Sequence, residues 1–272
     1  MVLLTTHALA GSLPGSEVAL PVAKRPAAAF EAPQRLIDAF DEDFFCISAD
    51  ESLLRDAAYR VRYAVYCLEN SFEDPAANPS GRETDEFDSH APHKLLVHRP
   101  SGTIAGVVRL ILPRLELPDQ GLPFNSLASR LAPADRLMTS VRMAEASRFA
   151  VVRQFREALR QAGAPSSSER LRTRVTVLKN VSIGLMRAIV EMAAENEVTH
   201  LCAVMEPALL RLLASLGVHF QALGPKVDYH GWRQPCTADL DQLLARTWTE
   251  RRDVWEVLTA AGAVWPLSRV DA

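Results

Sequence analysis

The spacing of apolar residues divides the chain into helical and extended segments. Apolar positions recur every three or four residues, and this period predicts helices over 35–40, 52–68, 125–131, 175–197, 207–216 and 238–256. Runs of β-branched and aromatic residues predict strands over 43–48, 94–97, 103–112, 141–151, 199–205 and 218–223. Because strands alternate with helices and one hairpin passes through HRPSG, we expect an α/β fold with a mixed central sheet flanked by helices.

The N-terminal segment differs from this central part. Residues 1–33 are rich in alanine, proline, glycine and serine, and they predict a flexible leader. Residues 34–272 are expected to form a single domain, with a C-terminal helical extension over 238–260. No apolar run reaches the roughly 18–20 residues that a membrane span needs. The N-terminus has no lysine or arginine before its short apolar run, which is unlike a signal peptide, so we expect a cytoplasmic protein.

Composition excludes some classes of function. The 272 residues are 48% hydrophobic and 23% charged, with a net charge of −3. This near-neutral balance argues against a protein whose main role is to hold duplex DNA. The four cysteines are far apart and form no CxxC pair, and the histidines show no ligand spacing. We therefore expect reduced thiols and no metal site.

Charged residues gather beside apolar segments at several places. Arg62 and Tyr66 are four residues apart on the predicted helix 52–68, so they share a face. The acidic stretch ETDEFD follows at 83–88. Arg109 is a lone charge in the apolar run GVVRLIL, and a charge in a half-buried strand needs a carboxylate partner. Glu145 or one of the loop acids is the natural candidate.

The strand segment MAEASRFAV adds a further polar group. Alternate side chains of an extended chain share a face, so Glu145 and Ser147 should lie together and Arg148 should point away, unless a bulge intervenes. These charges could form a purely stabilising ion-pair network. Their convergence from a helix, a loop and two strands instead favours a polar functional site.

In these motifs the chain resembles the acyl-homoserine-lactone synthases, which are autoinducer synthases with a fold of the GNAT-type N-acetyltransferase class. The shared motifs are an arginine followed by an aromatic residue, an E-x-D-x-x-D loop, an arginine in a strand after glycine, and E-x-S-R-F. Their positions here are Arg62, Tyr66, Glu83, Asp85, Asp88, Arg109, Glu145, Ser147, Arg148 and Phe149. The resemblance covers most of the chain that we expect to fold, and it implies a GNAT-like three-layer sandwich.

A second resemblance is narrower. The stretch LGPKVDYHGWRQP at 223–235, the C-terminal helix and the N-terminal extension resemble the PEP-CTERM/exosortase-associated acyltransferases, which are related to long-chain N-acyl amino acid synthases. The chain departs from the lactone synthases where those have a tryptophan after the first helix, since Phe72 is the nearest aromatic residue. The aromatic residue that opens their next strand is replaced around His93 and Lys94. Both positions help to shape the amine pocket, so an amino acid is favoured over S-adenosylmethionine as acceptor.

The resemblance implies an N-acyltransferase that moves a long-chain fatty acyl group from a thioester to the amino group of an amino acid. It implies that Glu145 is the base and that Ser147 and Arg148 complete the catalytic group. The implied substrate-binding residues are Arg62, Tyr66, Phe72, Glu83, Asp85, Asp88, Arg109 and Phe149. Within this set, Asp85 and Asp88 suit the ammonium, and Arg109 or Arg148 suits the carboxylate. Backbone N–H groups beside a bulge in the 145–149 strand would stabilise the oxyanion.

The acyl donor is expected to be acyl carrier protein, which presents the thioester on phosphopantetheine. No glycine-rich turn for a pyrophosphate follows Val151, which argues against coenzyme A. Residues 148–179 contain eight basic and two acidic residues, and such a patch would steer an acidic carrier. The expected docking residues are Arg153, Arg156, Arg170, Arg172, Arg174 and Lys179. The same charges could be a solvated helix face, whereas the absence of interleaved aromatic residues argues against nucleic acid as a partner.

Other readings stay open. The chain could be a lactone synthase that uses S-adenosylmethionine, or a non-catalytic acyl-binding module. We expect no tightly bound cofactor, and a lipid product could bring the protein to a membrane surface. Helix 175–192 and strand 201–205 could wall an acyl tunnel with Met186, Met192 and Met205, although a methionine at helical spacing is more often plain core. Tyr229 and His230 could assist proton transfer, although a structural loop anchor is the commoner role.

Overall fold

The computed structural model describes residues 2–4, 18–20, 35–114, 121–125, 142–153, 155, 157, 167–229 and 231–267, with only the backbone described over 2–4, 18–20 and 167–177. Its main sheet has the strand order β3-β4-β5-β6-β7-β10-β8, with β9 paired to β10. The strands are β3 (Phe44–Ser48), β4 (His93–His98), β5 (Thr103–Ile111), β6 (Met143–Val151), β7 (His200–Met205), β8 (Gln221–Ala222), β9 (Val227–Asp228) and β10 (Trp232–Asp239). All neighbours are antiparallel except β6 and β7, which confirms the predicted mixed sheet.

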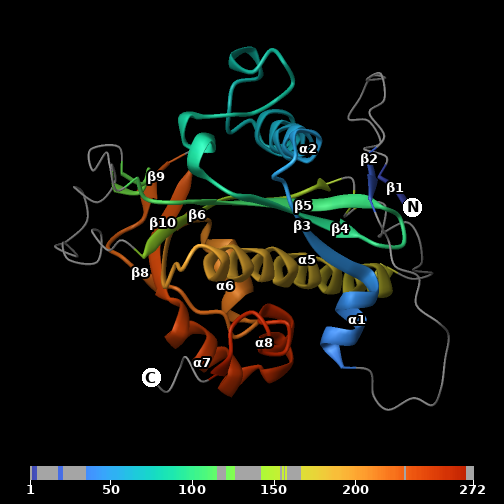
Figure 1. Ribbon diagram of the computed structural model, residues 1–272, viewed down its shortest axis with the longest axis vertical. Coiled ribbons are helices and arrows are strands. Elements are labelled where there is room, and N and C mark those ends of the chain that lie inside the picture. Colours follow the sequence, from blue (N-terminus) through green and yellow to red (C-terminus); the bar gives the residue numbers. More distant parts are fainter. Residues whose placement is uncertain are drawn as a thin grey trace.

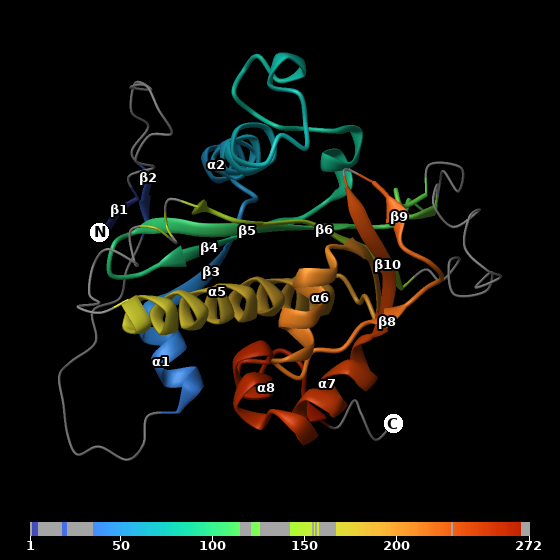
Figure 2. The same cartoon turned by 180° about the vertical axis from the view of Figure 1, so that it is seen from behind.

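Helices cover both faces of this sheet (Figures 1 and 2). One face carries α2 (Ser52–Tyr63), which continues directly into a π-helical segment, η1 (Ala64–Glu69). The opposite face carries α1 (Leu36–Asp43), α5 (Ser167–Glu195), α6 (Pro207–Ala214), α7 (Leu240–Glu250) and α8 (Arg252–Leu258). The predicted three-layer sandwich is therefore confirmed.

Each face of the sheet has its own apolar core. The stripe of α2 that includes Leu54, Ala58 and Val61 packs on Leu95 and Val107 of the sheet, as the helical period predicts. The larger core lies between the sheet and α5. Helix and sheet approach so closely there that a Cβ atom on Gly184 would lie 2.7 Å from the Leu96 side chain. The long helix thus packs tightly against the middle of the sheet, mainly on β4 and β5.

The strand β6 contains a bulge. Val107 of β5 pairs with Ala150, but Arg109 pairs with Ser147, so β6 takes three steps where β5 takes two. Arg148 absorbs the extra residue with a φ of 51°, in the left-handed region that a non-glycine residue rarely occupies. The alternation of side chains is therefore broken between Ser147 and Phe149, which re-aims the Arg148 side chain.

The parallel pairing of β6 with β7 is short. It runs from Met143 opposite His200 to Glu145 opposite Cys202 and then stops. Beyond that point β7 continues to pair with β10, where Met205 lies opposite Gln234. The part of β6 after Glu145 therefore has no β7 partner, and the two strands form opposite walls of a cavity.

Several predicted boundaries were wrong. The C-terminal segment over 238–256 is not one helix, because 232–239 is the sheet strand β10 and the remainder divides into α7 and α8 at Arg251. Helix α5 begins at Ser167, earlier than the predicted residue 175, and the strand predicted over 218–223 shrinks to β8. The predicted helix 125–131 lies mostly outside the described residues.

The leader is described only in part. Val2–Leu4 and Val18–Leu20 pair as two short antiparallel strands, β1 and β2. All four cysteines are free, and three of them are buried. Among the described residues, no helix is long and apolar enough to cross a membrane, and no group of His, Cys, Asp and Glu side chains has the arrangement of a metal site.

Candidate active site

Three arginines and three carboxylates meet above the bulge. The arginines come from α2, β5 and β6, and the carboxylates come from the loop before β4: Arg62, Arg109, Arg148, Glu83, Asp85 and Asp88. The structure thus brings together six residues that the sequence motifs singled out. Their convergence was predicted, but the pairing could not be.

Arg62 is the most deeply buried member of this ion-pair network. Its Nε lies 2.6 Å from Glu83 Oε2 and its Nη1 lies 2.5 Å from Asp88 Oδ1. His93 Nε2 lies 2.9 Å from the same Nη1. The side chains of Arg62 and Glu83 are 0% and 3% exposed, so their charges are held by each other and not by water.

Arg109 satisfies the expectation that a charge inside an apolar strand is paired. Its Nη1 lies 2.5 Å from Asp85 Oδ1 and 2.7 Å from Asp88 Oδ1, while its Nε donates to Ser147 Oγ at 3.0 Å. Its partners are therefore loop acids rather than Glu145. The contact with Ser147 joins β5 to the residue before the bulge.

Arg148 reaches the same loop because of the bulge. Its Nη2 lies 2.7 Å from Glu83 Oε1 and 3.2 Å from Asp85 Oδ2. Its Cζ also lies 5.2 Å from the centre of the Tyr66 ring. Without the extra residue in β6, the alternation of the strand would direct Arg148 to the other face of the sheet.

The acidic loop is folded to present these carboxylates. Asp85 caps a short 3₁₀ helix (Glu86–His90), in which its carboxylate accepts a hydrogen bond from the Phe87 N–H at 3.0 Å. The Asp88 carboxylate accepts one in return from the Asp85 N–H at 2.8 Å. This reciprocal capping box fixes both acids before they meet the arginines.

These pairings keep the Glu83 and Asp88 carboxylates ionised. Burial opposes the charge on Glu83, but the hydrogen bonds from Arg148 and Arg62 outweigh it and lower the pKa of Glu83 to about 2. Burial likewise opposes the charge on Asp88, yet His93 and Arg62 hold its pKa far below the usual range. The six charged groups largely neutralise one another. Asp85, Asp88, Arg109 and Arg148 are therefore already paired with other members of the network. Their roles toward an ammonium and a carboxylate stay predictions.

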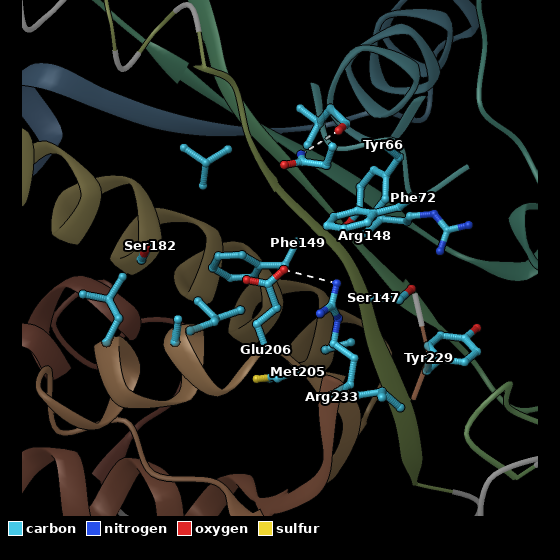
Figure 3. A pocket seen from close by; sticks show the side chains of 18 of the residues that line it. Tyr66, Phe72, Ser147, Arg148, Phe149, Ser182, Met205, Glu206, Tyr229 and Arg233 are labelled. Atoms are coloured by element: carbon cyan, nitrogen blue, oxygen red, sulfur yellow. Dashed lines mark hydrogen bonds and ion pairs between the residues drawn. The ribbon is translucent and has the colours of Figure 1, made fainter. Parts of the chain in front are cut away.

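Beside this network lies a cavity of about 420 Å³, shown in Figure 3. One end is apolar and is walled by α5, α6 and β6, with Leu178, Ile189, Leu209, Leu212 and Val151 in its lining. The other end is polar and includes Tyr66, Asn70, Glu73, Ser147, Arg148, Glu206, Tyr229 and Arg233. Phe72 and Phe149 also line it. A cavity of this size and mixed lining is typical of small-molecule sites.

The methionines expected in an acyl tunnel divide between two roles. Met205 lines the cavity at the end of β7. Met186 and Met192 are fully buried in the core behind it and do not line the cavity. The commoner reading of a methionine at helical spacing therefore holds for the two residues on α5.

Glu145 lies at the point where β6 and β7 separate. Its side chain is almost fully buried among apolar residues, and its Oε2 accepts a hydrogen bond from the Phe124 N–H at 2.7 Å. Burial raises its pKa to about 7, against the opposing effects of that hydrogen bond and of Arg109 and Arg148. Burial also raises the pKa of Tyr229, and the nearby Glu145 adds to the shift. A carboxyl that titrates near neutral pH can exchange protons during a reaction.

Some residues of the cavity were not predicted from the sequence. Glu73, Glu206 and Arg233 all line the polar end. Glu206 and Arg233 form an ion pair at 3.2 Å between the loop after β7 and β10. They are 27 positions apart on elements whose pairing the sequence did not reveal, so no spacing signal could have joined them. Glu73 belongs to the acidic stretch after α2, where only residues 83–88 had been singled out.

The expected docking residues lie partly outside the described structure. Arg153 follows β6 and is exposed, and its Nη2 donates to the Glu69 carbonyl at 2.6 Å. Lys179 is half-buried on α5. Arg170, Arg172 and Arg174 belong to the backbone-only turns of α5, and Arg156 is outside the described residues. Their docking role stays a prediction.

Comparison with known proteins agrees with this architecture. Residues 61–162 match a family profile described as an acetyltransferase (GNAT) domain. TofI, solved in a ternary complex with an inhibitor and MTA, has a TM-score of 0.54 and 22% identity, over 82% of this chain and 99% of that chain. BjaI, a CoA-dependent acyl-homoserine lactone synthase solved with MTA, has a TM-score of 0.49 and 21% identity, over 84% and 98%. FeeM, an N-acyl amino acid synthase from uncultured soil microbes, has a TM-score of 0.48 and 17% identity, over 75% and 93%.

A search of curated protein sequences finds no match. The family profile and the likeness to TofI confirm the predicted GNAT-like fold, and the profile confirms the acyltransferase class of residues 61–162. The narrower relation to PEP-CTERM/exosortase-associated acyltransferases stays a prediction.

Proposed function

We propose that this GNAT-type acyltransferase moves a fatty acyl group from an acyl-carrier-protein thioester to the amino group of an amino acid. The products are an N-acyl amino acid and the free thiol of the carrier. The observation that carries the proposal is that one cavity has both an apolar end and a charged end, which meet at the bulge of β6. An acyl chain fits the first end and a small zwitterion fits the second.

The apolar end suits the acyl chain. Leu178 and Ile189 come from α5, and Leu209 and Leu212 come from α6, so two helices enclose the space behind β6. Burying apolar surface contributes about 0.8 kcal/mol per methylene group, which favours a long chain over a short one. The described residues that line this end carry no charge, and the charged lining residues all belong to the polar end.

The acceptor amine must lose a proton before it attacks. We assign this proton to Glu145, whose pKa of about 7 leaves roughly half of it ionised at neutral pH. Its side chain does not itself line the cavity, so the proton would pass through a water molecule or through Tyr229, which does. Glu73, also in the lining, is a suitable counter-charge for the incoming ammonium.

The bond changes then follow at β6. The neutral amine nitrogen attacks the thioester carbon, a C–N bond forms, and negative charge develops on the carbonyl oxygen. Backbone N–H groups at the bulge, next to Arg148, are released from the regular ladder and would donate to this oxyanion. Collapse of the intermediate breaks the C–S bond, the attacking nitrogen gives up a second proton to become the amide, and the leaving thiolate takes up this proton. Arg148, held by Glu83, fixes the geometry of the bulge.

The donor proposal concerns the surface near the start of α5. Arg153 is exposed just after the end of β6. Arg170, Arg172 and Arg174 follow in the helix that begins at Ser167, so all four belong to one basic segment of the sequence. An acidic carrier protein would be steered by this charge. The absence of a glycine-rich turn after Val151 supports a carrier protein over free coenzyme A.

A lactone synthase that uses S-adenosylmethionine is a second candidate. The Tyr66 and Phe72 rings lie 6.0 Å apart, and both side chains line the polar end, where such a pair could contact a nucleoside base. This reading differs from the first only in the acceptor.

Lipids from cells that express the wild type or Glu145→Gln distinguish the readings. Mass spectrometry should find an N-acyl amino acid that disappears with the variant. An acyl lactone would support the second candidate and overturn the first. If no new amide or lactone forms under any feeding condition, a non-catalytic acyl-binding module is favoured. Thiol release at equal rates from acyl carrier protein and acyl-CoA would contradict the donor proposal.

A further inference from the structure

The described lining of the cavity contains two arginines, and their charges are held very differently. Arg148 makes several close contacts with Glu83 and a further one with Asp85, and these partners raise its pKa further against the effect of burial. Among the described residues, Arg233 has one ion pair, from its Nη2 to Glu206 Oε1 at 3.2 Å, and its Nη1 donates to the Trp232 carbonyl at 3.3 Å. The Glu206 side chain is 48% exposed. Arg148 is therefore committed to the fold, whereas the partner of Arg233 can turn into solvent.

Arg233 is also well placed for binding. It is the second residue of β10 and pairs with Val227 of β9. Its guanidinium lies over the Phe72 ring, with Cζ 5.1 Å from the ring centre. Figure 3 shows the side chain extending toward Glu206, to which a dashed line joins it. The aromatic contact and the pairing with β9 hold the fork in one orientation, and the Arg233 side chain is only 14% exposed.

We propose that Arg233 binds the carboxylate of the acceptor amino acid, and that Glu206 holds the guanidinium until this carboxylate arrives. The inference rests on the proposed function and adds the residue that reads the acceptor. A carboxylate matches the arginine fork with two parallel hydrogen bonds, whereas Glu206 contacts only Nη2 and Nη1 donates to a backbone carbonyl. Exchanging a partly exposed ion pair costs little, since such pairs contribute only about 0–1 kcal/mol.

The charges around Arg233 fit a zwitterion. Glu73 belongs to the same polar end, where its Oε1 lies 3.7 Å from Arg148 Nη2 and its side chain is 30% exposed, and it offers the opposite charge for the ammonium. Arg109 and Arg148, which were expected to bind the carboxylate, have their guanidinium groups on Asp85, Asp88 and Glu83. In this proposal the carboxylate site lies on β10 instead of in the ion-pair network.

Binding of product-like probes tests this without requiring turnover. The probes are N-lauroylglycine and N-lauroylglycinamide, which differ only in the carboxylate, and calorimetry measures both affinities. The wild type should bind the acid about tenfold or more tightly than the amide, as expected for a hydrogen bond between charged groups. Arg233→Met should remove this preference, and Arg233→Lys should keep part of it. Glu206→Gln should strengthen binding of the acid, because a competing carboxylate is lost.

Arg246→Met is the matched control, because Arg246 is exposed on α7 and pairs with Glu250 outside the cavity. It should leave the preference for the acid unchanged. The inference is overturned if Arg233→Met keeps the wild-type preference for N-lauroylglycine, or if Glu206→Gln lowers the affinity for N-lauroylglycine. It is also overturned if the wild type binds both probes equally or binds neither. If the preference is found but no amide is made from any acyl thioester and amino acid, the proposed reaction fails while the carboxylate site stands.

Discussion

Arg148 Nη2 and Glu83 Oε1 lie 2.7 Å apart, and this contact ties the bulge of β6 to the acidic loop. Glu83 also accepts from Arg62 Nε at 2.6 Å, so one carboxylate neutralises two arginines. Its loss would leave two guanidinium groups without this counter-charge in a largely buried place. The loop and the strand that shapes the cavity therefore depend on the same charge.

Glu83→Gln should lower the free energy of unfolding by about 3–5 kcal/mol, the range found when one partner of a buried ion pair is removed. Denaturant unfolding followed by circular dichroism measures it. Glu86→Gln is the matched control in the same loop, where the side chain is exposed, and it should change stability by less than about 0.5 kcal/mol. A loss below about 1 kcal/mol for Glu83→Gln would mean that the network is not a unit of stability.

The stability of the protein should fall in acid because of this network. The folded pKa of Glu83, about 2, lies below its ordinary value of 4.5, so its contribution is present above pH 4.5 and is lost as pH falls toward 2. Asp88 shifts in the same direction. Unfolding free energies at pH 2.5–6 should therefore drop steeply below pH 4.5 in the wild type and less steeply in Glu83→Gln. Parallel curves for the two proteins would contradict this assignment.

Glu145 should have the opposite effect on stability. Its folded pKa of about 7 lies above the ordinary 4.5, so the folded protein is favoured while the carboxyl is protonated, and stability is lost as pH rises from 4.5 to 7. The loss should approach about 3 kcal/mol. Glu145→Gln should remove this dependence and should unfold less readily than the wild type at pH 8. A wild-type curve that is flat between pH 5 and 7.5 would show that Glu145 is already ionised at pH 5.

The same group should set the pH dependence of the reaction. If Glu145 is the base, kcat should rise with pH through about 7 and then level off. Glu145→Gln should reduce kcat by about 10²-fold or more and leave no inflection in the profile. Steady-state thiol release between pH 5.5 and 9 measures both. Retention of the inflection in Glu145→Gln would assign it to another group.

The apolar end should limit the length of the acyl chain. Ser182 lines this end from α5 and is buried, so Ser182→Phe would add bulk inside the cavity. The preferred acyl length should shorten by several carbons while the amino acid preference stays the same. Competition between acyl thioesters of different length, analysed by mass spectrometry, gives the profile. An unchanged profile in a folded Ser182→Phe protein would place the acyl chain elsewhere.

The sequence revealed much of the fold because its strongest signals are local. The helical period of α2 and the apolar run of β7 follow directly from which face each element buries. β10 was missed in part because Pro235, opposite Val204, argues against a central strand. The division of the last helix at Arg251 depends on packing that no local pattern encodes.

The site was only partly predictable for a similar reason. Local motifs identified Arg62, Arg109 and Arg148, but which acid pairs with each depends on the bulge at Arg148, and bulges leave no clear mark in a single sequence. Arg233 and Glu206 meet only because β10 pairs with β7. Their contact is a consequence of the order of strands in the sheet, which composition and residue spacing do not predict.

The most direct test of the proposed reaction is its stoichiometry with purified components. Acylated long-chain acyl carrier protein and a mixture of amino acids should give one N-acyl amino acid for each free thiol released, and Glu145→Gln should reduce the rates of both together by about 10²-fold or more. Thiol release without an amide, or an acyl lactone formed only when S-adenosylmethionine is added, would contradict the account.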